Sequence, residues 1–401
     1  MTYRELLARL YAARRFGIKL GLDRMRAVLD ALGAPDRRLG EVVHVGGTNG
    51  KGSTVAMIAA LAHGGGARVA TYTSPHLSSL RERIAIDGEL ASEAAIVAAA
   101  ERVYGAAGSI ELTFFELITA IAMVIVAEAG VDVTVLEVGL GGRLDATNVV
   151  DAPVAVVTGV ALDHEAILGD TLAAIAREKA GIFKRGRRAV IGASGEPEAV
   201  PLLAAHAHAA GVAELDIVDD AAIARVPPLA LAGAHQRRNA AAALAAWRGP
   251  CDPAALARVQ HPGRFERAGD LVLDGAHNPH GARALAATLA ELALRPVLVI
   301  AVSSDKDVAA IAGALAPAVR AVIATRYQQE RALEPARLAA AFAGLAPVDT
   351  APDLPAALAR ARALGGPIVV AGSLFLVGEA RVRCLGAPAD PIAISDPAVR
   401  R

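Results

Sequence analysis

The chain has 401 residues, 54% of them hydrophobic and 20% charged, which is enough for two domains with separate cores. It carries 41 Lys and Arg residues and 41 Asp and Glu residues, and this balance argues against nucleic-acid and membrane surfaces and favours small-molecule substrates. Its two cysteines, Cys251 and Cys384, lie far apart without metal-ligand spacing, which argues against a disulfide framework and a zinc site.

The first informative elements are a strand predicted over 41–45 and a helix predicted over 55–61, joined by a glycine-rich loop. Glycines allow backbone N–H groups to turn toward a polyphosphate, Lys51 can reach the outer phosphates, and a following hydroxyl can bind Mg²⁺. The sequence therefore predicts a nucleoside triphosphate site, with contacts from Gly47, Thr48, Asn49, Gly50, Lys51, Gly52, Ser53 and Thr54.

This loop departs from the common P-loop spacing. That spacing needs a glycine five residues before the Gly-Lys pair and a hydroxyl directly after the lysine, where this chain has Val45 and Gly52. The hydroxyls of Ser53 and Thr54 come one residue late. A glycine-rich turn without a ligand is the alternative, but Gly-Lys with adjacent hydroxyls after a strand favours the nucleotide site.

Short apolar runs then alternate with longer helical patterns. Strands are predicted over 68–72, 133–138 and 154–158, and helices over 92–103, 114–128 and 171–182. This alternation predicts an α/β fold in which a mostly parallel, P-loop-type sheet is covered by helices. Ligands of such folds gather at the carboxyl ends of strands, and polar loops follow these strands at 73–76, 139–143 and 162–164.

A second round of alternation begins near residue 265. Its predicted strands cover 271–273, 297–302, 321–324 and 368–371. We place the domain boundary after a helix predicted over 239–247, so that residues 1–263 form the nucleotide-binding domain and residues 264–401 form a smaller Rossmann-like α/β domain. The tail from about residue 386 is rich in Ala, Pro and Asp and is expected to be loosely attached.

Three side chains of the first domain are candidates for chemistry. Glu137 closes the strand 133–138, where its carboxylate suits Mg²⁺, although pairing with Arg143 is the alternative. His164 follows another strand, and a lone histidine is more often structural than a ligand. Only five of the 41 basic residues are lysines, so Lys179 is a candidate for a task that arginine cannot perform, although alone it resembles a salt-bridged helix residue.

The second domain contributes a further polar cluster. Residues 274–280 include Asp274 and His277, follow a predicted strand and precede a helix. The residues 304–307 (Ser-Asp-Lys-Asp) fit a helix cap as readily as a ligand contact. Binding loops on two domains indicate a reaction from which water is excluded, such as the capture of an acyl phosphate by an amine.

These segments together resemble folylpolyglutamate synthase, also called dihydrofolate synthase, a family of the Mur ligase superfamily. The resemblance covers nearly the whole chain and rests on residues 47–53, 73–77, 113–116, 137–148, 162–164, 178–182, 233–239, 262–264 and 274–279. The late hydroxyl of the glycine-rich loop is this family's own variant. Another amide ligase of the superfamily, acting on a cell-wall or polymer precursor, is the alternative, and Gly52 and the Leu-Asp-Ala-Thr-Asn loop (144–148) argue against it.

The resemblance implies ATP and two Mg²⁺ ions, and it assigns roles to side chains. Ser53, Ser74 and Glu137 would hold the first ion, and Glu137, His164 and a carbamylated Lys179 would hold the second. Asn239, Arg264 and Asp274 would contact ATP. The pterin-bearing substrate would be bound by Thr113, Phe114, Phe115, Glu116, Leu144, Asp145 and Ala146, and L-glutamate by His277 and Ser373. The residues expected to act in catalysis are Lys51, Lys179, His164 and His277.

The implied reaction activates a pterin or folate carboxylate as an acyl phosphate and joins it to L-glutamate. The expected partners are dihydropteroate or a reduced folate, L-glutamate and ATP, with no nucleic acid or membrane, and the family resemblance implies a monomer. Charged residues stand where a signal peptide needs an apolar run, and the apolar stretch 118–127 is too short to span a bilayer, so a cytoplasmic protein is expected.

Overall fold

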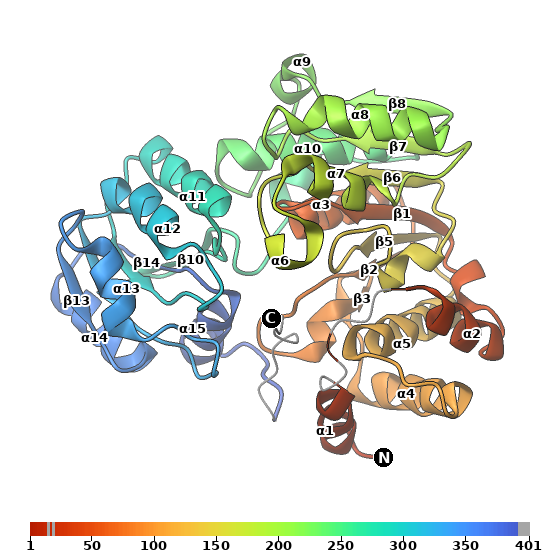
Figure 1. Ribbon diagram of the computed structural model, residues 1–401, viewed down its shortest axis with the longest axis horizontal. Helices are drawn as coiled ribbons and strands as arrows, with labels where there is room; N and C mark the ends of the chain where they lie inside the picture. Colours follow the sequence, from red (N-terminus) through yellow and green to blue (C-terminus); the bar gives the residue numbers. More distant parts are fainter. Residues whose placement is uncertain (14–16, 18–20, 392–401) are drawn as a thin grey trace. The chain divides into compact units, whose positions relative to one another are not determined.

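The computed structural model describes residues 1–13, 17 and 21–391, which form two compact units (Figure 1). The first unit contains Met1–Ala230 and Arg237–Val259, and the chain returns to it at Asp390. The second unit contains Leu231–Gln236 and Gln260–Ala389. One of the five lysines, Lys19, lies outside the described residues. Two units built from helices and largely parallel sheets confirm the predicted fold class.

The first unit is built on an eight-stranded sheet in the order β4-β3-β2-β5-β1-β6-β7-β8. The neighbouring pairs from β2 to β8 are parallel, and the short strands β3 and β4 add an antiparallel edge. The strands are β1 (Glu41–Gly46), β2 (Val69–Tyr72), β3 (Ile84–Ile86), β4 (Glu89–Leu90), β5 (Val133–Glu137), β6 (Val154–Val157), β7 (Arg188–Ile191) and β8 (Glu214–Ile217). Because β2, β5, β1 and β6 are parallel neighbours, the loops that follow them share one edge of the sheet.

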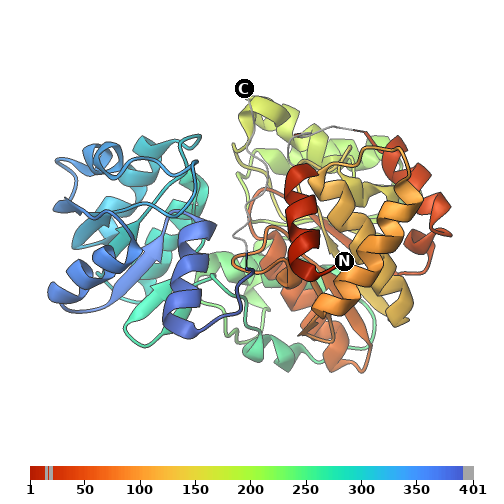
Figure 2. The ribbon, with the colours of Figure 1, turned by 90° about the horizontal axis from the view of Figure 1, so that it is seen from below.

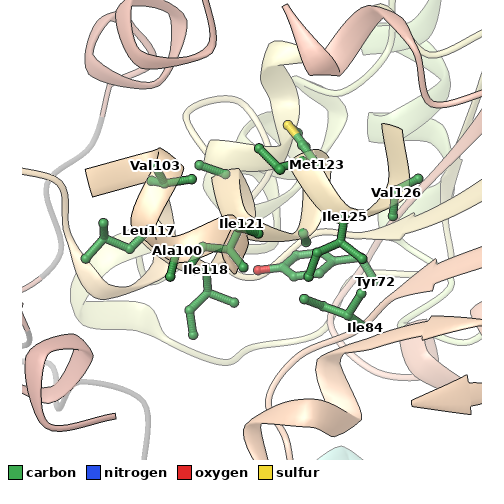
Figure 3. Packing of buried hydrophobic residues seen from close by; sticks show 14 of the residues in the cluster. Tyr72, Ile84, Ala100, Val103, Leu117, Ile118, Ile121, Met123, Ile125 and Val126 are labelled. Carbon is green, nitrogen blue, oxygen red and sulfur yellow. The ribbon is translucent and has the colours of Figure 1, made fainter. Parts of the chain in front are cut away.

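Helices cover this sheet and bury the core. In Figures 1 and 2, α4 and α5 run side by side and α1 packs on them. The centre of this packing is Tyr72 of β2 against the apolar side chains of α5, as Figure 3 shows. The helices are α1 (Tyr3–Ala12), α2 (Asp23–Ala31), α3 (Lys51–Gly64), α4 (Glu93–Ala107), α5 (Phe114–Ala129), α6 (Glu165–Leu168), α7 (Leu172–Ala180), α8 (Ala199–Ala210), α9 (Asp220–Ala224) and α10 (Ala234–Ala246), with short 3-10 turns at η2 (Pro35–Arg37), η3 (Leu80–Arg83), η4 (Ala146–Val149) and η5 (Pro253–Arg258).

The apolar stretch 118–127 lies within α5, where most side chains are buried against the sheet and α4. Within residues 1–13, 17 and 21–391, no helix has the length and hydropathy needed to cross a membrane.

The second unit has a six-stranded sheet in the order β13-β12-β11-β14-β10-β9. All neighbouring pairs are parallel except β9 and β10. The strands are β9 (Glu266–Ala268), β10 (Leu271–Leu273), β11 (Val297–Ile300), β12 (Ala321–Ala324), β13 (Val348–Thr350) and β14 (Ile368–Ala371). The helices are α11 (Pro279–Glu291), α12 (Val308–Leu315), α13 (Pro335–Phe342), α14 (Leu354–Ala363) and α15 (Leu374–Leu385), with a short turn at η6 (Ala316–Ala318).

The tail after α15 is less loose than expected at one residue. The carboxylate of Asp390 accepts hydrogen bonds from the Tyr3 hydroxyl at 3.0 Å, the Ser79 hydroxyl at 2.8 Å and the Leu80 backbone N–H at 2.7 Å. The expectation of a loose tail is therefore wrong at Asp390, because its carboxylate accepts hydrogen bonds from three groups of the first unit. The part of that prediction that concerns residues 392–401 lies outside the described residues.

Candidate functional site

The glycine-rich loop (residues 47–54) lies between β1 and α3, and helix α3 begins at Lys51, earlier than the predicted 55. Gly47 and Gly50 have φ angles of 136° and 84°, in the region that favours glycine. A Cβ on Gly47 would collide with the Thr158 hydroxyl, and one on Gly50 would collide with the Asn239 amide. The loop thus places the positive end of a 14-residue helix where it can face phosphate oxygens.

Hydrogen bonds attach this loop to the segment that follows β6. The Thr48 backbone N–H donates to the Gly159 carbonyl at 2.9 Å, and the Thr158 hydroxyl donates to the Asn49 carbonyl at 2.7 Å. Sequence reasoning missed Thr158, although it closes the predicted strand 154–158 at the carboxyl edge of the sheet. These bonds tie the loop to the segment after β6.

Asn239, predicted to contact ATP, is placed beside the glycine-rich loop by α10. Its side chain is 1% exposed, and its Oδ1 accepts a hydrogen bond from the Ser194 hydroxyl at 2.7 Å. Ser194 follows β7 and was also missed from the sequence, because nothing local links it to residue 239. The pair fixes the amide against Gly50.

Glu137 ends β5 directly beside the loop. Val45 of β1 is its register partner, the Ser74 backbone N–H donates to Glu137 Oε2 at 3.0 Å, and Lys51 Nζ lies 4.0 Å from Glu137 Oε1. Arg143, the alternative partner, forms its ion pair with Glu178 at 2.9 Å. The structure thus brings Lys51, Ser74 and Glu137 together at the edge where the sequence placed them.

Lys179 reaches the same loop from α7. Lys179 is 5% exposed, and its Nζ donates a hydrogen bond to the Gly47 carbonyl at 2.9 Å, so it bonds to a backbone oxygen and not to the carboxylate of a helix salt bridge. Burial, followed by the charge of Lys51, lowers the pKa of Lys179 to about 7. Above that pH the amine is mostly neutral, which is the form that reacts with CO₂.

His164 lies at the start of α6, in the loop after β6. Its φ of 53° is left-handed, its imidazole is 38% exposed, and Nε2 lies 4.0 Å from Asp163 Oδ1. The imidazole is therefore accessible to a ligand near Asp163. Ser53 is buried in the first turn of α3.

The donors available here fit a magnesium ion that shares its shell with phosphate and water. Over the described residues 1–13, 17 and 21–391, no three His, Cys, Asp or Glu side chains gather closely enough to hold a metal alone. Glu137 and the Ser53 hydroxyl are hard oxygen donors, which Mg²⁺ prefers when phosphate oxygens and waters complete its shell.

The predicted substrate segment 113–116 is largely occupied by its own fold. Thr113 caps α5, and Thr113 and Glu116 form a reciprocal capping box, while Glu116 also pairs with Arg24 at 2.9 Å. Phe114 is fully buried in the core. Phe115 is only half-buried, and its ring lies over Gly139, where a Cβ would collide with it, and 6.2 Å from the Tyr72 ring.

The second predicted substrate segment, 144–146, likewise contains buried residues and one partly exposed residue. Asp145 is buried and accepts hydrogen bonds from the Leu140 backbone N–H at 2.8 Å and the Thr147 hydroxyl at 2.5 Å, and burial raises the pKa of its carboxyl. Ala146 is buried as well. Leu144 alone keeps a partly exposed side chain.

The second unit gathers its predicted residues at the carboxyl edge of its own sheet. The Asp274 carboxylate accepts from the backbone N–H groups of Phe265 and Ala276, each at 2.9 Å, and burial raises its pKa while Arg264 opposes the shift. His277 Nδ1 lies 2.7 Å from the Gly275 carbonyl.

Two further predicted segments of the second unit act as helix caps. Ser373 accepts from the Phe375 N–H at 3.1 Å at the start of α15. Asp307, in the 304–307 segment, caps α12 by accepting from the Ala310 N–H at 2.9 Å. Lys306, its neighbour, lies 3.9 Å from Asp305. The helix-cap interpretation of this segment therefore holds at Asp307.

Comparison with known proteins identifies relatives over most of the chain. The Mur ligase middle domain matches residues 45–213, and the Mur ligase glutamate ligase domain matches residues 263–374. Folylpolyglutamate synthase of Lacticaseibacillus casei is 35% identical over 431 residues, covering 96% of this chain and 99% of that protein. The probable bifunctional folylpolyglutamate synthase/dihydropteroate synthase of Haloferax volcanii is 38% identical over 428 residues, covering 95% of this chain and 50% of the relative. The chain thus spans about half the length of this bifunctional relative.

Solved structures show the same architecture with ligands bound. Mycobacterium tuberculosis folylpolyglutamate synthase complexed with ADP superposes with a TM-score of 0.86 at 34% identity, covering 96% of this chain and 99% of that one. Escherichia coli FolC in complex with DHPP and ADP gives 0.86 at 31% identity, with 96% and 98% covered. The Yersinia pestis bifunctional synthase with AMPPNP and Mn gives 0.86 at 31% identity, with the same coverage.

Proposed function

Because the chain belongs to the folylpolyglutamate synthase/dihydrofolate synthase family of Mur ligases, we propose that it is an ATP-dependent ligase that joins a pterin-bearing carboxylic acid to L-glutamate. The observation that carries this proposal is the convergence of Lys51, Glu137 and Lys179 on one glycine-rich loop. Relatives solved with ADP, with AMPPNP and Mn, and with DHPP support it.

The glycine-rich loop binds the triphosphate of ATP in this proposal. Its backbone N–H groups and the amino end of α3 face the phosphates, and Lys51 offsets negative charge on the transferred phosphoryl group. Asn239, whose amide lies against Gly50, contacts the nucleotide. Two Mg²⁺ ions, one held by Ser53, Ser74 and Glu137 and one by Glu137, His164 and Lys179, would offset the negative charge of the phosphates.

The reaction proceeds through two displacements. The substrate carboxylate attacks the γ-phosphorus of ATP, and the bond between that phosphorus and the β,γ-bridging oxygen breaks. ADP departs, and the substrate becomes an acyl phosphate. The neutral amine of L-glutamate attacks the acyl carbon, and the tetrahedral intermediate loses phosphate and a proton to give the amide. The chain's residues contribute mainly by positioning the reactants and by electrostatics, since an acyl phosphate is already reactive.

Lys179 acts as a carbamate in this scheme. Its neutral amine adds CO₂ and releases a proton, which converts a buried neutral amine into an anionic oxygen ligand. The 5% exposure of Lys179 and the hydrogen bond from its Nζ to Gly47 support this role, because they hold the nitrogen beside the phosphate site. Arginine could not replace it, because a guanidinium stays protonated.

The acceptor acid is recognised on the half-buried side of the two substrate segments. Phe115 offers a ring face next to Gly139, and Leu144 offers an apolar side chain from the neighbouring loop. An aromatic pterin suits such a stacking surface.

Small molecules are the partners in this proposal, and the enzyme acts as a monomer. Light scattering of the purified protein checks the oligomeric state.

One incubation tests the proposed function. Purified protein is supplied with MgATP and L-glutamate, and with either dihydropteroate or tetrahydrofolate, and products are identified by mass. A mass gain of one glutamate with either acid, dependent on ATP and absent in Lys51→Ala, is the expected result. Nucleotide binding without ligation of either acid would redirect the proposal to another acceptor acid of the Mur ligases.

A further inference from the structure

A chain of buried polar side chains leads from β1 to the loop that carries the acceptor segment. His44 lies in β1, three residues before Gly47, and its Nε2 is 2.8 Å from the Thr147 hydroxyl oxygen. That hydroxyl is 2.5 Å from Asp145 Oδ1, and Asp145 Oδ2 accepts from the Leu140 backbone N–H at 2.8 Å. His44 and Thr147 are both fully buried.

The donor and acceptor capacities of these side chains fix the direction of each hydrogen bond that links His44, Thr147 and Asp145. Both Asp145 oxygens accept from backbone N–H groups, and the Thr147 hydroxyl donates its single hydrogen to Asp145 Oδ1. The Thr147 oxygen is then left as the acceptor for His44, and the imidazole hydrogen resides on Nε2. His44 therefore donates, and the chain ends at the loop backbone.

Packing alone does not account for a histidine at this position. Burial, with a contribution from Lys184, lowers the pKa of His44 to about 3, so the ring is neutral. Its Nδ1 is buried and has no hydrogen-bond partner among the described residues. A leucine would avoid the cost of that unsatisfied nitrogen, so what the histidine adds is the Nε2–H donor toward Thr147.

We propose that His44 is a positioning residue for the acceptor substrate, holding the 139–146 loop to the strand that carries the glycine-rich loop. The inference rests on the proposed function, because it assumes that Phe115 over Gly139 and Leu144 form the pterin surface. Through Thr147 and Asp145, His44 fixes the backbone on which that surface is built. Because His44 is fully buried, it touches none of the three substrates, and its effect is confined to how firmly the acceptor is held.

Two substitutions at position 44 test this role. His44→Leu keeps the volume and removes the donor, and His44→Gln keeps an N–H donor. In the leucine variant the KM for the pterin acid should rise roughly 10-fold, which matches one lost hydrogen bond, while the KM for ATP stays within about twofold. The glutamine variant should recover most of the affinity for the acid.

A matched pair at Thr147 checks that the effect runs through this chain. Thr147→Ser keeps the hydroxyl and should leave the acceptor KM near wild type, whereas Thr147→Val should raise it. Combining His44→Leu with Thr147→Val should add little to either change, because both interrupt one chain. Additive effects would overturn the inference, and so would equal rises of the KM for ATP and the acid.

One measurement without substrate separates the role of His44 from a folding defect and from a failure of the proposed function. Nitrogen-15 NMR of the histidine ring should show the hydrogen on Nε2 of His44, and Thr147→Val should shift that signal. A hydrogen on Nδ1 overturns the inference. A wild-type protein that ligates neither acid overturns the proposed function, whereas an active protein whose leucine variant keeps its acceptor KM overturns only the role of His44.

Discussion

The proposed nucleotide side of the first unit and its proposed acceptor side use their polar residues in opposite ways. On the proposed nucleotide side, the backbone of the glycine-rich loop faces the ligand, and Lys51, Glu137 and Lys179 come together from three different elements. On the acceptor side, Thr113, Glu116 and Asp145 are hydrogen bonded inside the protein, and the surface left for a ligand is mainly the apolar side chains of Phe115 and Leu144.

The difference teaches that a glycine-rich backbone frees side chains for chemistry. Gly47 and Gly50 allow the nucleotide loop to pack closely on Thr158 and Asn239, so few side chains are needed to shape it. The acceptor loop 139–146 also contains glycines that pack closely, such as Gly139 against Phe115, but there the buried Asp145 also shapes the backbone through its hydrogen bonds. Substitutions on the nucleotide side should therefore lower activity with little loss of stability. On the acceptor side, substitutions of buried residues should lower stability, and substitutions of partly exposed apolar residues should weaken binding of the acid.

The largest effect is expected at Lys51. Lys51→Ala should lower kcat/KM for ATP by roughly 10³-fold, because it removes a positioned charge from the phosphoryl group in transfer. Its melting temperature should stay near that of the wild type. Arg68→Ala is the matched control, since it deletes an exposed cation directly before β2 that pairs with Asp87. Wild-type kcat/KM in Lys51→Ala would refute the phosphate site.

A smaller loss is expected at Lys179. Lys179→Ala should lose roughly 100-fold in activity, in line with the loss of a metal ligand, and acetate should restore part of it by supplying the missing carboxylate oxygens. Acetate should not help Lys51→Ala, whose deficiency is a positive charge. Full activity of Lys179→Ala without acetate would show that this lysine is structural.

The two adjacent phenylalanines separate the acceptor side into its two classes. Phe114→Ala empties a fully buried site and should cost about 3–5 kcal/mol in the free energy of unfolding. Phe115→Ala should leave most of that stability and raise the KM for the pterin acid about 10-fold, through lost ring contact. Denaturant unfolding and steady-state kinetics on both variants measure the contrast, and reversed effects would contradict it.

The smallest effect is expected at the cap of α5. Thr113→Ala should lower the free energy of unfolding by about 1 kcal/mol, because the N–H of Glu116 loses its side-chain acceptor, and the acceptor KM should not change. Thr113→Ser keeps the hydroxyl and should be close to wild type. A raised KM with unchanged stability would mean that Thr113 contacts the substrate instead.

Some of this site could be predicted because its signals are local. The strand, glycine-rich loop and helix around Lys51 are adjacent in the chain, and Glu137 and His164 each follow an apolar run. Short strands such as β3 and β4 were missed, because a few residues carry too little periodicity. The adjacent Phe114 and Phe115 could not be told apart, since burial depends on which face of α5 meets the sheet.

The sequence by itself determined the fold class, the family and the candidate residues at strand ends, because these depend on periodicity and on motifs with short spacing. Only the tertiary structure decided that Lys179 meets Gly47, that Asn239 closes on Gly50 and that Asp390 returns to the first unit. These contacts join residues far apart in the chain. Their geometry is set by strand order and helix packing, which no local pattern encodes.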